Sequence, residues 1–246
     1  MRRDEATRMH SKVWLRRWGS AHVGLSRTHG RRRRATWLRA LGFAAVFFAV
    51  SVEWSASFCW AESETRSPDA REILKYGTIE AGGTIGYWQA LRFHSKEHST
   101  NRSAVFIMPR VGMVVTDEVQ AGVLTGNLEV LVEPFFARFT HPFAAEAAGG
   151  ALVLKYNLLS FGRWMPFWDA GAGMLWTNLA PRIQEQSTPL NFVIETGPGI
   201  QYFLTTQTAL TFGVRFSHIS NADIGRRNLG LDAVLPYAGI SWFLPR

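Results

Sequence analysis

Residues 210–221 have the sequence LTFGVRFSHISN, in which apolar and polar side chains alternate. One parity holds Leu210, Phe212, Val214 and Phe216, and the other holds Thr211, Gly213, Arg215 and Ser217. Successive side chains of a β-strand point to opposite faces, so this alternation predicts a strand with one apolar and one polar face. Such a strand is typical of a small transmembrane β-barrel, whose outer wall meets lipid and whose lumen is polar.

The same strand ends with polar residues on its apolar face. His218 and Ser220 follow Phe216 at two-residue steps, so both are expected to point outward. Polar side chains on a lipid-facing wall are costly unless they meet a ligand or the interface. Because the Cα atoms of residues i and i+2 on a strand lie about 6.6 Å apart, an imidazole can span the gap to a hydroxyl. His218 and Ser220 are therefore candidates for the base and the nucleophile of a serine hydrolase.

A serine hydrolase also needs an acid that holds the histidine in the correct tautomer. Asp232 follows the turn at residues 222–231 and begins the next expected strand, so hairpin pairing would place it beside His218. Asp223 is nearer in sequence, but uninterrupted strand parity would point it to the opposite face. On residue types alone, an interfacial histidine and serine with no chemistry is the alternative, since short motifs are often accidental.

Seven further segments have the length and composition of strands. Most exceed the usual five or six residues of soluble strands and match the roughly 9–11 that cross a bilayer at a tilt. The eight expected strands are 79–91, 104–115, 122–132 running on towards 136, 147–158, 166–176, 190–203, 210–220 and 233–243. An even number of antiparallel strands can close without a free edge. We therefore expect an all-β, eight-stranded antiparallel transmembrane β-barrel, with a soluble barrel or sandwich as the alternative.

Five tryptophans lie near the ends of these expected strands, and they are Trp88, Trp164, Trp168, Trp176 and Trp242. Tryptophan is enriched at the two interfaces of a membrane, where barrels carry aromatic girdles. We therefore expect these side chains to lie on the outer wall. Glu129 and Glu133 share one parity, and we expect both to face the lumen.

The N-terminal region differs in charge from the rest of the chain. Residues 1–61 contain 12 Lys and Arg against 3 Asp and Glu, whereas the remaining residues contain 15 against 16. A basic run at 31–34 precedes the apolar stretch 41–50, and small residues lead to Ala61. This order is typical of an export signal, and the apolar stretch is shorter than the roughly 20 residues of a spanning helix. We expect residues 1–61 to be an N-terminal extension with a signal peptide and residues 62–246 to be the barrel.

The near-neutral body argues against nucleic-acid binding, which needs a basic stripe on the folded part. Cys59 is the single cysteine and lies in the leader, so the body can form no internal disulfide. Residues 94–98 have the H-x-x-E-H spacing of a zinc peptidase, but that chemistry needs a helix and these residues lie between two expected strands. We expect no metal, no other cofactor and no nucleic acid.

The segment from His218 to Ala222, followed by Asn228, Gly230 and Asp232, resembles the signature of the PagL-type lipid A 3-O-deacylases. The resemblance extends back through 166–167 with 171–173 and through 190–192 with 197–199, and covers the earlier strands by type only. It departs from the family pattern at Asp232, where well-known members carry Glu, and at Leu229, where Pro or a polar residue is common.

The resemblance implies an outer-membrane barrel whose active site lies on the outer wall and removes the ester-linked 3-hydroxyacyl chain at position 3 of lipid A. It implies Ser220 as the nucleophile, His218 as the base and Asp232 as the orienting acid. It also implies oxyanion or loop support from Asn221, Asn228 and Gly230.

Arg226 and Arg227 lie in the loop above this expected site. They are candidates for contacts with lipid A phosphates, because basic residues at the interface attract anionic head groups; a solvated charge pair is the alternative. We expect lipopolysaccharide as substrate and the outer membrane as location, and we leave open whether the chain forms a homodimer. The rival classes are a non-catalytic structural or adhesion barrel and a soluble lipid-binding barrel.

Overall fold

A computed structural model describes residues 67–91, 101–180 and 182–245. The expected signal peptide in residues 1–61 and the histidines of residues 94–98 lie outside these ranges. The elements are α2 (Ala70–Ile73), β1 (Ile79–Ala90), β2 (Ser103–Val114), the 3₁₀ turn η1 (Gly122–Leu124), β3 (Gly126–His141), β4 (Ala145–Leu158), β5 (Trp164–Thr177), β6 (Leu190–Phe203), β7 (Thr208–Ser220) and β8 (Leu231–Leu244). Within the described ranges, no helix has the length and apolar character needed to cross a membrane.

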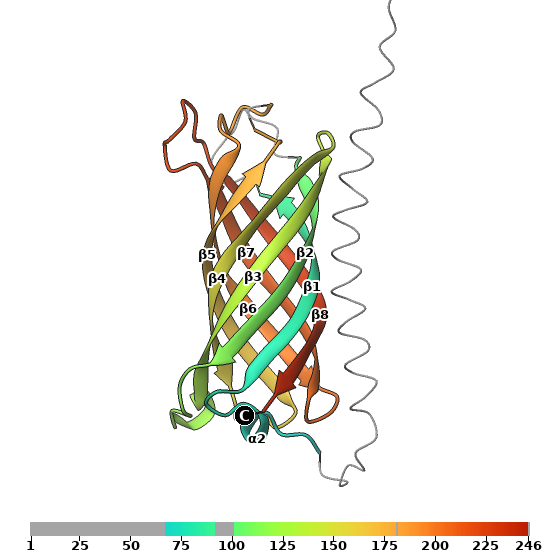
Figure 1. Cartoon of the computed structure of the whole chain (residues 1–246), viewed down its shortest axis with the longest axis vertical. Helices are drawn as coiled ribbons and strands as arrows, with labels where there is room; N and C mark the ends of the chain where they lie inside the picture. The colour runs from blue at the N-terminus through green and yellow to red at the C-terminus, as the bar shows by residue number, and fades with distance from the viewer. Residues whose placement is uncertain (1–66, 92–100, 181, 246) are drawn as a thin grey trace, which may run out of the picture. The chain divides into compact units, whose positions relative to one another are not determined.

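The strands form a closed antiparallel barrel (Figure 1). Each strand pairs with its neighbours in the chain, and β1 closes the sheet by pairing with β8 from Ile79↔Leu244 to Ala90↔Ala233. Closure leaves no strand edge unpaired, which the hydrocarbon of a bilayer requires. The eight-stranded antiparallel barrel expected from the sequence is confirmed.

The largest difference from the expected strand boundaries is in β3. Residues 122–124, expected to begin this strand, form the turn η1, in which Gly122 has a left-handed φ of 61°. That conformation interrupts an extended strand, so pairing with β4 starts only at Gly126↔Leu158. At its other end β3 runs beyond the expected limit to His141.

The alternation predicted for residues 210–217 is present in β7. Phe212, Val214 and Phe216 are exposed on the outer wall, whereas Arg215 and Ser217 are buried in the lumen. Other strands add exposed apolar side chains to the wall, among them Ile85, Val111, Val132, Leu152, Met174 and Ile194. An apolar wall around a polar interior is the arrangement of a barrel that lies in lipid.

The lumen is packed with buried charged side chains. Arg215 binds Glu133, Asp169 and Glu195 at distances of 2.5, 2.7 and 2.7 Å. In a second network, Lys155 on β4 forms ion pairs with Glu80 on β1 and Glu129 on β3. Buried charges are tolerated when they are paired and hydrogen-bonded in this way. The expectation that Glu129 and Glu133 face the lumen is confirmed.

The tryptophans divide between the wall and the lumen. Trp164, Trp168 and Trp176 are each more than half exposed on the wall, as expected, and Trp242 is partly buried with the same outward parity. The expectation for Trp88 is wrong, because its side chain is fully buried. Its indole N–H donates to the Ser217 hydroxyl at 3.4 Å, and Tyr87 takes the exposed position beside it.

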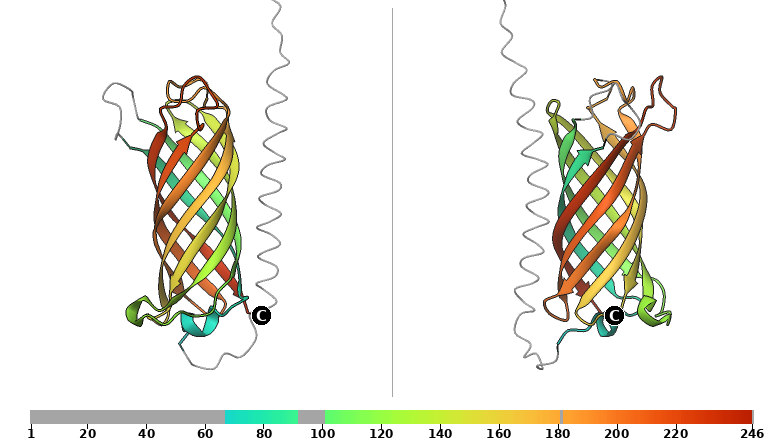
Figure 2. Two further views of the ribbon diagram at one scale, coloured as in Figure 1. Left: turned by 90° about the vertical axis from the view of Figure 1, so that its left-hand side faces the viewer. Right: turned by 180° about the vertical axis from the view of Figure 1, so that it is seen from behind.

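One end of the barrel carries α2 and the C-terminus (Figure 1). Ala70 and Leu74 are buried there, and Asn127 donates to the Leu74 carbonyl at 2.8 Å. A hydrogen bond from Arg71 lowers the pKa of Glu118 beside this segment. The opposite end carries the connections 142–144 and 221–230 and the described residues of the β5–β6 connection, 178–180 and 182–189 (Figure 2). Because bacterial barrels place their longer loops outside the cell, this second end is the extracellular one.

We expect the mature chain to partition with the outer membrane and to migrate faster on a gel before boiling than after it. A closed barrel keeps all its backbone hydrogen bonds in the sheet, so detergent alone should not unfold it. The measurement compares heated and unheated samples of the membrane fraction by electrophoresis. Recovery of folded chain in the soluble fraction, with one gel position before and after heating, would contradict this prediction.

Candidate active site

His218 and Asp232 face each other across β7 and β8 at the extracellular end of the barrel. They are direct partners in the strand register, and His218 Nδ1 lies 2.7 Å from Asp232 Oδ1. The His218 side chain is 41% exposed and that of Asp232 is 19% exposed, both on the outer wall. When Nδ1 donates to the carboxylate, the neutral imidazole presents Nε2 as its proton acceptor.

Ser220 is the last residue of β7 and has the same outward parity as His218. Immediately beyond it the chain turns, and Ala222 and Asp223 have left-handed φ values of 50° and 60°. Non-glycine residues adopt this conformation rarely, and such residues concentrate at functional sites. The serine therefore stands at the rim of the barrel, on the same wall as the His218–Asp232 pair.

Two asparagines close the loop that follows Ser220. The backbone N–H of Asn221 donates to the Asn228 side chain at 2.9 Å, and the Asn221 side chain, which is fully buried, donates to the Arg227 carbonyl at 2.7 Å. Asn228 also donates to Asp223 at 3.0 Å, which engages this carboxylate within the loop. These contacts give both asparagines a role in loop support, and their role as oxyanion donors stays a prediction.

Gly230 packs against the imidazole. Its φ is 71°, and a Cβ added there would lie 2.7 Å from His218 Cε1. Any side chain would therefore be strained and would displace His218. The site thus needs glycine at this position for both conformation and space.

A second loop braces the first. The β5–β6 connection lies beside the β7–β8 loop, where the Glu185 carbonyl accepts from the Leu229 N–H at 3.0 Å. The Ser187 hydroxyl accepts from the Arg227 N–H at 3.1 Å and donates to the Arg227 carbonyl at 3.2 Å. The loop that bears the candidate site is thereby held in place from outside its own hairpin.

The bracing loop is itself anchored by a buried ion pair. Arg102, which precedes β2, binds the Glu185 carboxylate at 2.6 Å, and both side chains are less than a tenth exposed. Gln186 adds a hydrogen bond of 3.2 Å to the Ile219 carbonyl on β7. Sequence reasoning missed these supporting residues, because they contact the site only through loops that are distant in the chain.

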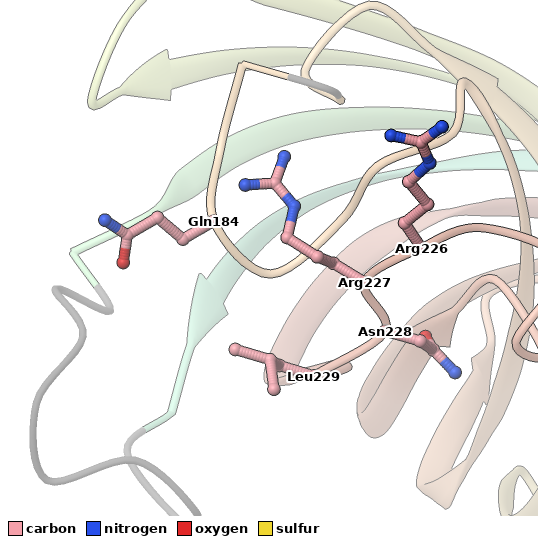
Figure 3. Close-up of a pocket in the computed structure, with 5 residues that line it drawn as sticks. All are labelled: Gln184, Arg226, Arg227, Asn228 and Leu229. Carbon is pink, nitrogen blue, oxygen red and sulfur yellow. The ribbon is translucent and has the colours of Figure 1, made fainter.

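Two open hollows lie on the surface of the barrel, one beside the site and one further along the wall. A cavity of about 580 Å³ is lined by Gln184, Arg226, Arg227, Asn228 and Leu229 (Figure 3). A hollow of about 450 Å³ lies over β1, β2 and β8 and is lined by Ile85, Gly86, Tyr87, Val105, Pro236, Tyr237 and Ala238. Pro236 and Ala238 have the same outward parity as Asp232, so this mostly apolar hollow lies on the wall that bears the site.

The sequence-predicted residues thus gather at one place: His218, Ser220 and Asp232 on the wall, Asn221, Asn228 and Gly230 in the loop beside them, and Arg226 and Arg227 at the adjoining cavity. Among the described residues, no group of three or more His, Cys, Asp and Glu side chains is arranged to hold a metal ion.

The fold defines a transmembrane β-barrel, and its outer wall carries the His218–Asp232 pair. The family model described as "Lipid A 3-O-deacylase (PagL)" matches residues 81–241, and the chain belongs to this family. It is accordingly an outer-membrane barrel of a lipid A deacylase family. No curated protein sequence matches the chain.

Several solved structures are similar to the chain. The crystal structure of the outer membrane enzyme PagL is 16% identical, has a TM-score of 0.45, and covers 68% of this chain and 99% of its own. Neisserial surface protein A is 13% identical, with a TM-score of 0.42 and coverages of 67% and 95%. The N-terminal barrel of Pseudomonas aeruginosa OprF is 10% identical, with a TM-score of 0.42 and coverages of 69% and 98%.

Proposed function

We propose that this chain is a carboxylic-ester hydrolase that removes the ester-linked 3-hydroxyacyl chain from lipid A in the outer leaflet. Ser220 acts as the nucleophile, His218 as the general base and Asp232 as the acid that orients it. The observation that carries the proposal is the 2.7 Å contact between His218 and Asp232 on the outer wall, on the same face as Ser220. Family membership supports the substrate class.

In the proposed reaction, the His218–Asp232 pair moves the proton of the serine hydroxyl. His218 Nε2 accepts the proton of the Ser220 hydroxyl as the serine oxygen attacks the ester carbonyl carbon. The imidazolium, stabilised by Asp232, then gives that proton to the departing sugar oxygen as the ester bond breaks. Water, activated by the same imidazole, next cleaves the acyl-serine and releases the fatty acid.

The position of the site favours a lipid substrate over a soluble one. His218 and Ser220 point outward from the wall and not into the lumen, so the substrate approaches from the leaflet. The apolar hollow over β1, β2 and β8 lies on the same wall and offers a surface for a hydrocarbon chain. A structural or adhesion barrel has no need for a hydrogen-bonded His–carboxylate pair on the face that carries Ser220.

The experiment that tests this function expresses the chain in a lipopolysaccharide-bearing bacterium and measures the mass of its lipid A. We expect a new species that has lost one 3-hydroxyacyl group, and no such species with Ser220→Ala. Chelators should leave the rate unchanged, because serine chemistry needs no metal ion; strong inhibition would return attention to residues 94–98. Unchanged lipid A in the presence of well-expressed, folded barrel would favour the non-catalytic alternative.

A further inference from the structure

Two side chains from neighbouring loops hold the backbone on either side of Ser220. The Gln186 amide donates to the Ile219 carbonyl at 3.2 Å, and the Asn228 side-chain oxygen accepts from the Asn221 N–H at 2.9 Å. A peptide unit is planar and includes both of its flanking Cα atoms, so each of these bonds restrains a plane that contains the Ser220 Cα. Together they restrain the direction in which the Ser220 side chain leaves the backbone.

The two residues that make these bonds also pair with each other. Gln186 in the β5–β6 connection and Asn228 in the β7–β8 connection form an isolated antiparallel bridge. Beside this bridge, the Leu229 N–H donates to the Glu185 carbonyl at 3.0 Å. The two bonds on the backbone around Ser220 therefore belong to one unit, and a shift of either loop would disturb both.

The loop that carries Gln186 is anchored to the barrel. The carboxylate of the preceding residue, Glu185, is buried in its ion pair with Arg102. Such a pair is costly to break, because the remaining charge would be buried without its partner. Gln186 itself is 2% exposed, which leaves it no surface for a substrate. Any effect of its side chain on catalysis must therefore pass through the residues that it holds.

Ser220 needs support of this kind because it lies at the end of the sheet. Pairing of β7 with β8 ends at Ile219↔Leu231, one residue before the serine. A displacement of about 1 Å at a reacting group can cost about 10²-fold in rate. We propose that Gln186 is a positioning residue and forms, with Asn228, a clamp that holds the Ser220 hydroxyl in reach of its base. This inference rests on the proposed function.

The first test is Gln186→Leu, which roughly keeps the size of the side chain and removes the donor. We expect kcat on purified lipid A to fall by about tenfold to 10²-fold and KM to change less than about twofold, because the buried side chain does not touch the substrate. Gel migration before and after heating checks the folding of the barrel.

Asn178→Leu is the matched control for this variant. Asn178 lies in the same β5–β6 connection, and its side chain accepts from the Glu146 N–H on β4 at 2.8 Å. The control removes a hydrogen bond of the connection but leaves the clamp in place, so it should keep its kcat. An equal loss of kcat in both variants would show that general loosening of the connection, and not the clamp, lowers the rate.

The second test is Gln186→Glu, which preserves the shape of the side chain and makes the hydrogen bond depend on pH. A protonated carboxyl donates to the Ile219 carbonyl, whereas an ionised carboxylate can only accept. We expect the ratio of variant to wild-type kcat to be highest at acidic pH and to fall as the carboxyl ionises. If this ratio is constant with pH and Gln186→Leu is as active as the wild type, the bond has no part in catalysis.

Hydrogen exchange measures the clamp without turnover. In Gln186→Leu, the Asn221 N–H should exchange about tenfold faster than in the wild type, because the loop that carries its acceptor, Asn228, has lost its partner contact. Unchanged exchange at this amide would overturn the clamp, whatever the activity. If the wild type hydrolyses no lipid A, the proposed function fails, and the exchange rate still decides whether the clamp exists.

Discussion

Ser220→Ala is expected to lower lipid A ester hydrolysis by on the order of 10⁶-fold, which is the scale on which removal of the nucleophile disables serine proteases. The hydroxyl supplies the oxygen that forms the acyl-enzyme, and His218 and Asp232 have no proton to transfer without it. Ser220 is partly buried on the outer wall, outside the charged networks of the lumen. The barrel should therefore fold as before.

The measurement is the initial rate on purified lipid A, with gel migration before and after heating as the check on folding. Ser217→Ala is the matched control, because Ser217 lies on the same strand but is buried in the lumen beside Trp88. We expect this control to keep its activity. Full turnover in Ser220→Ala would remove Ser220 as the nucleophile.

Asp232→Asn is expected to lower turnover by about 10⁴-fold, as loss of the triad carboxylate does in other serine hydrolases. The carboxylate accepts from His218 Nδ1 at 2.7 Å and stabilises the imidazolium formed during attack. An amide can instead donate to Nδ1, which would leave Nε2 protonated and unable to act as the base. KM should change much less than kcat, because Asp232 acts through His218.

Asp232→Glu is the conservative variant and should retain most of the activity. Asp232 reaches the imidazole directly from its position opposite His218, and the outer wall leaves room for one more methylene. Asp223→Asn is the matched control, because Asp223 lies in the loop that joins β7 to β8 and its carboxylate accepts a hydrogen bond from Asn228. If the Asp223 variant loses activity and the Asp232 variants do not, the assignment of the acid is wrong.

The strand periodicity is a local property, and together with the length and composition of the segments it predicted most of the barrel. The alternation around Arg215 placed this residue inside and Phe216 outside, and the same two-residue step placed His218 and Ser220 on one wall. Hairpin pairing then brought Asp232 into reach of His218, which the register confirms. These inferences succeed because antiparallel strands that follow one another in the sequence can be joined by a short hairpin connection and then pair side by side in the sheet.

Only closure of the barrel decided the contacts between distant parts of the chain. Loops that are far apart in the sequence meet at three places, and their spacing predicts none of these contacts. These places are the Arg102–Glu185 ion pair, the hydrogen bond between Ser187 and Arg227, and the cavity at Gln184. Trp88 is a further example of what the sequence could not predict. A tryptophan near the end of a strand can lie in the aromatic girdle on the outer wall or be buried in the lumen, and Trp88 is buried. Periodicity determines to which face a side chain points, but the partners it meets there depend on how eight strands curve and close.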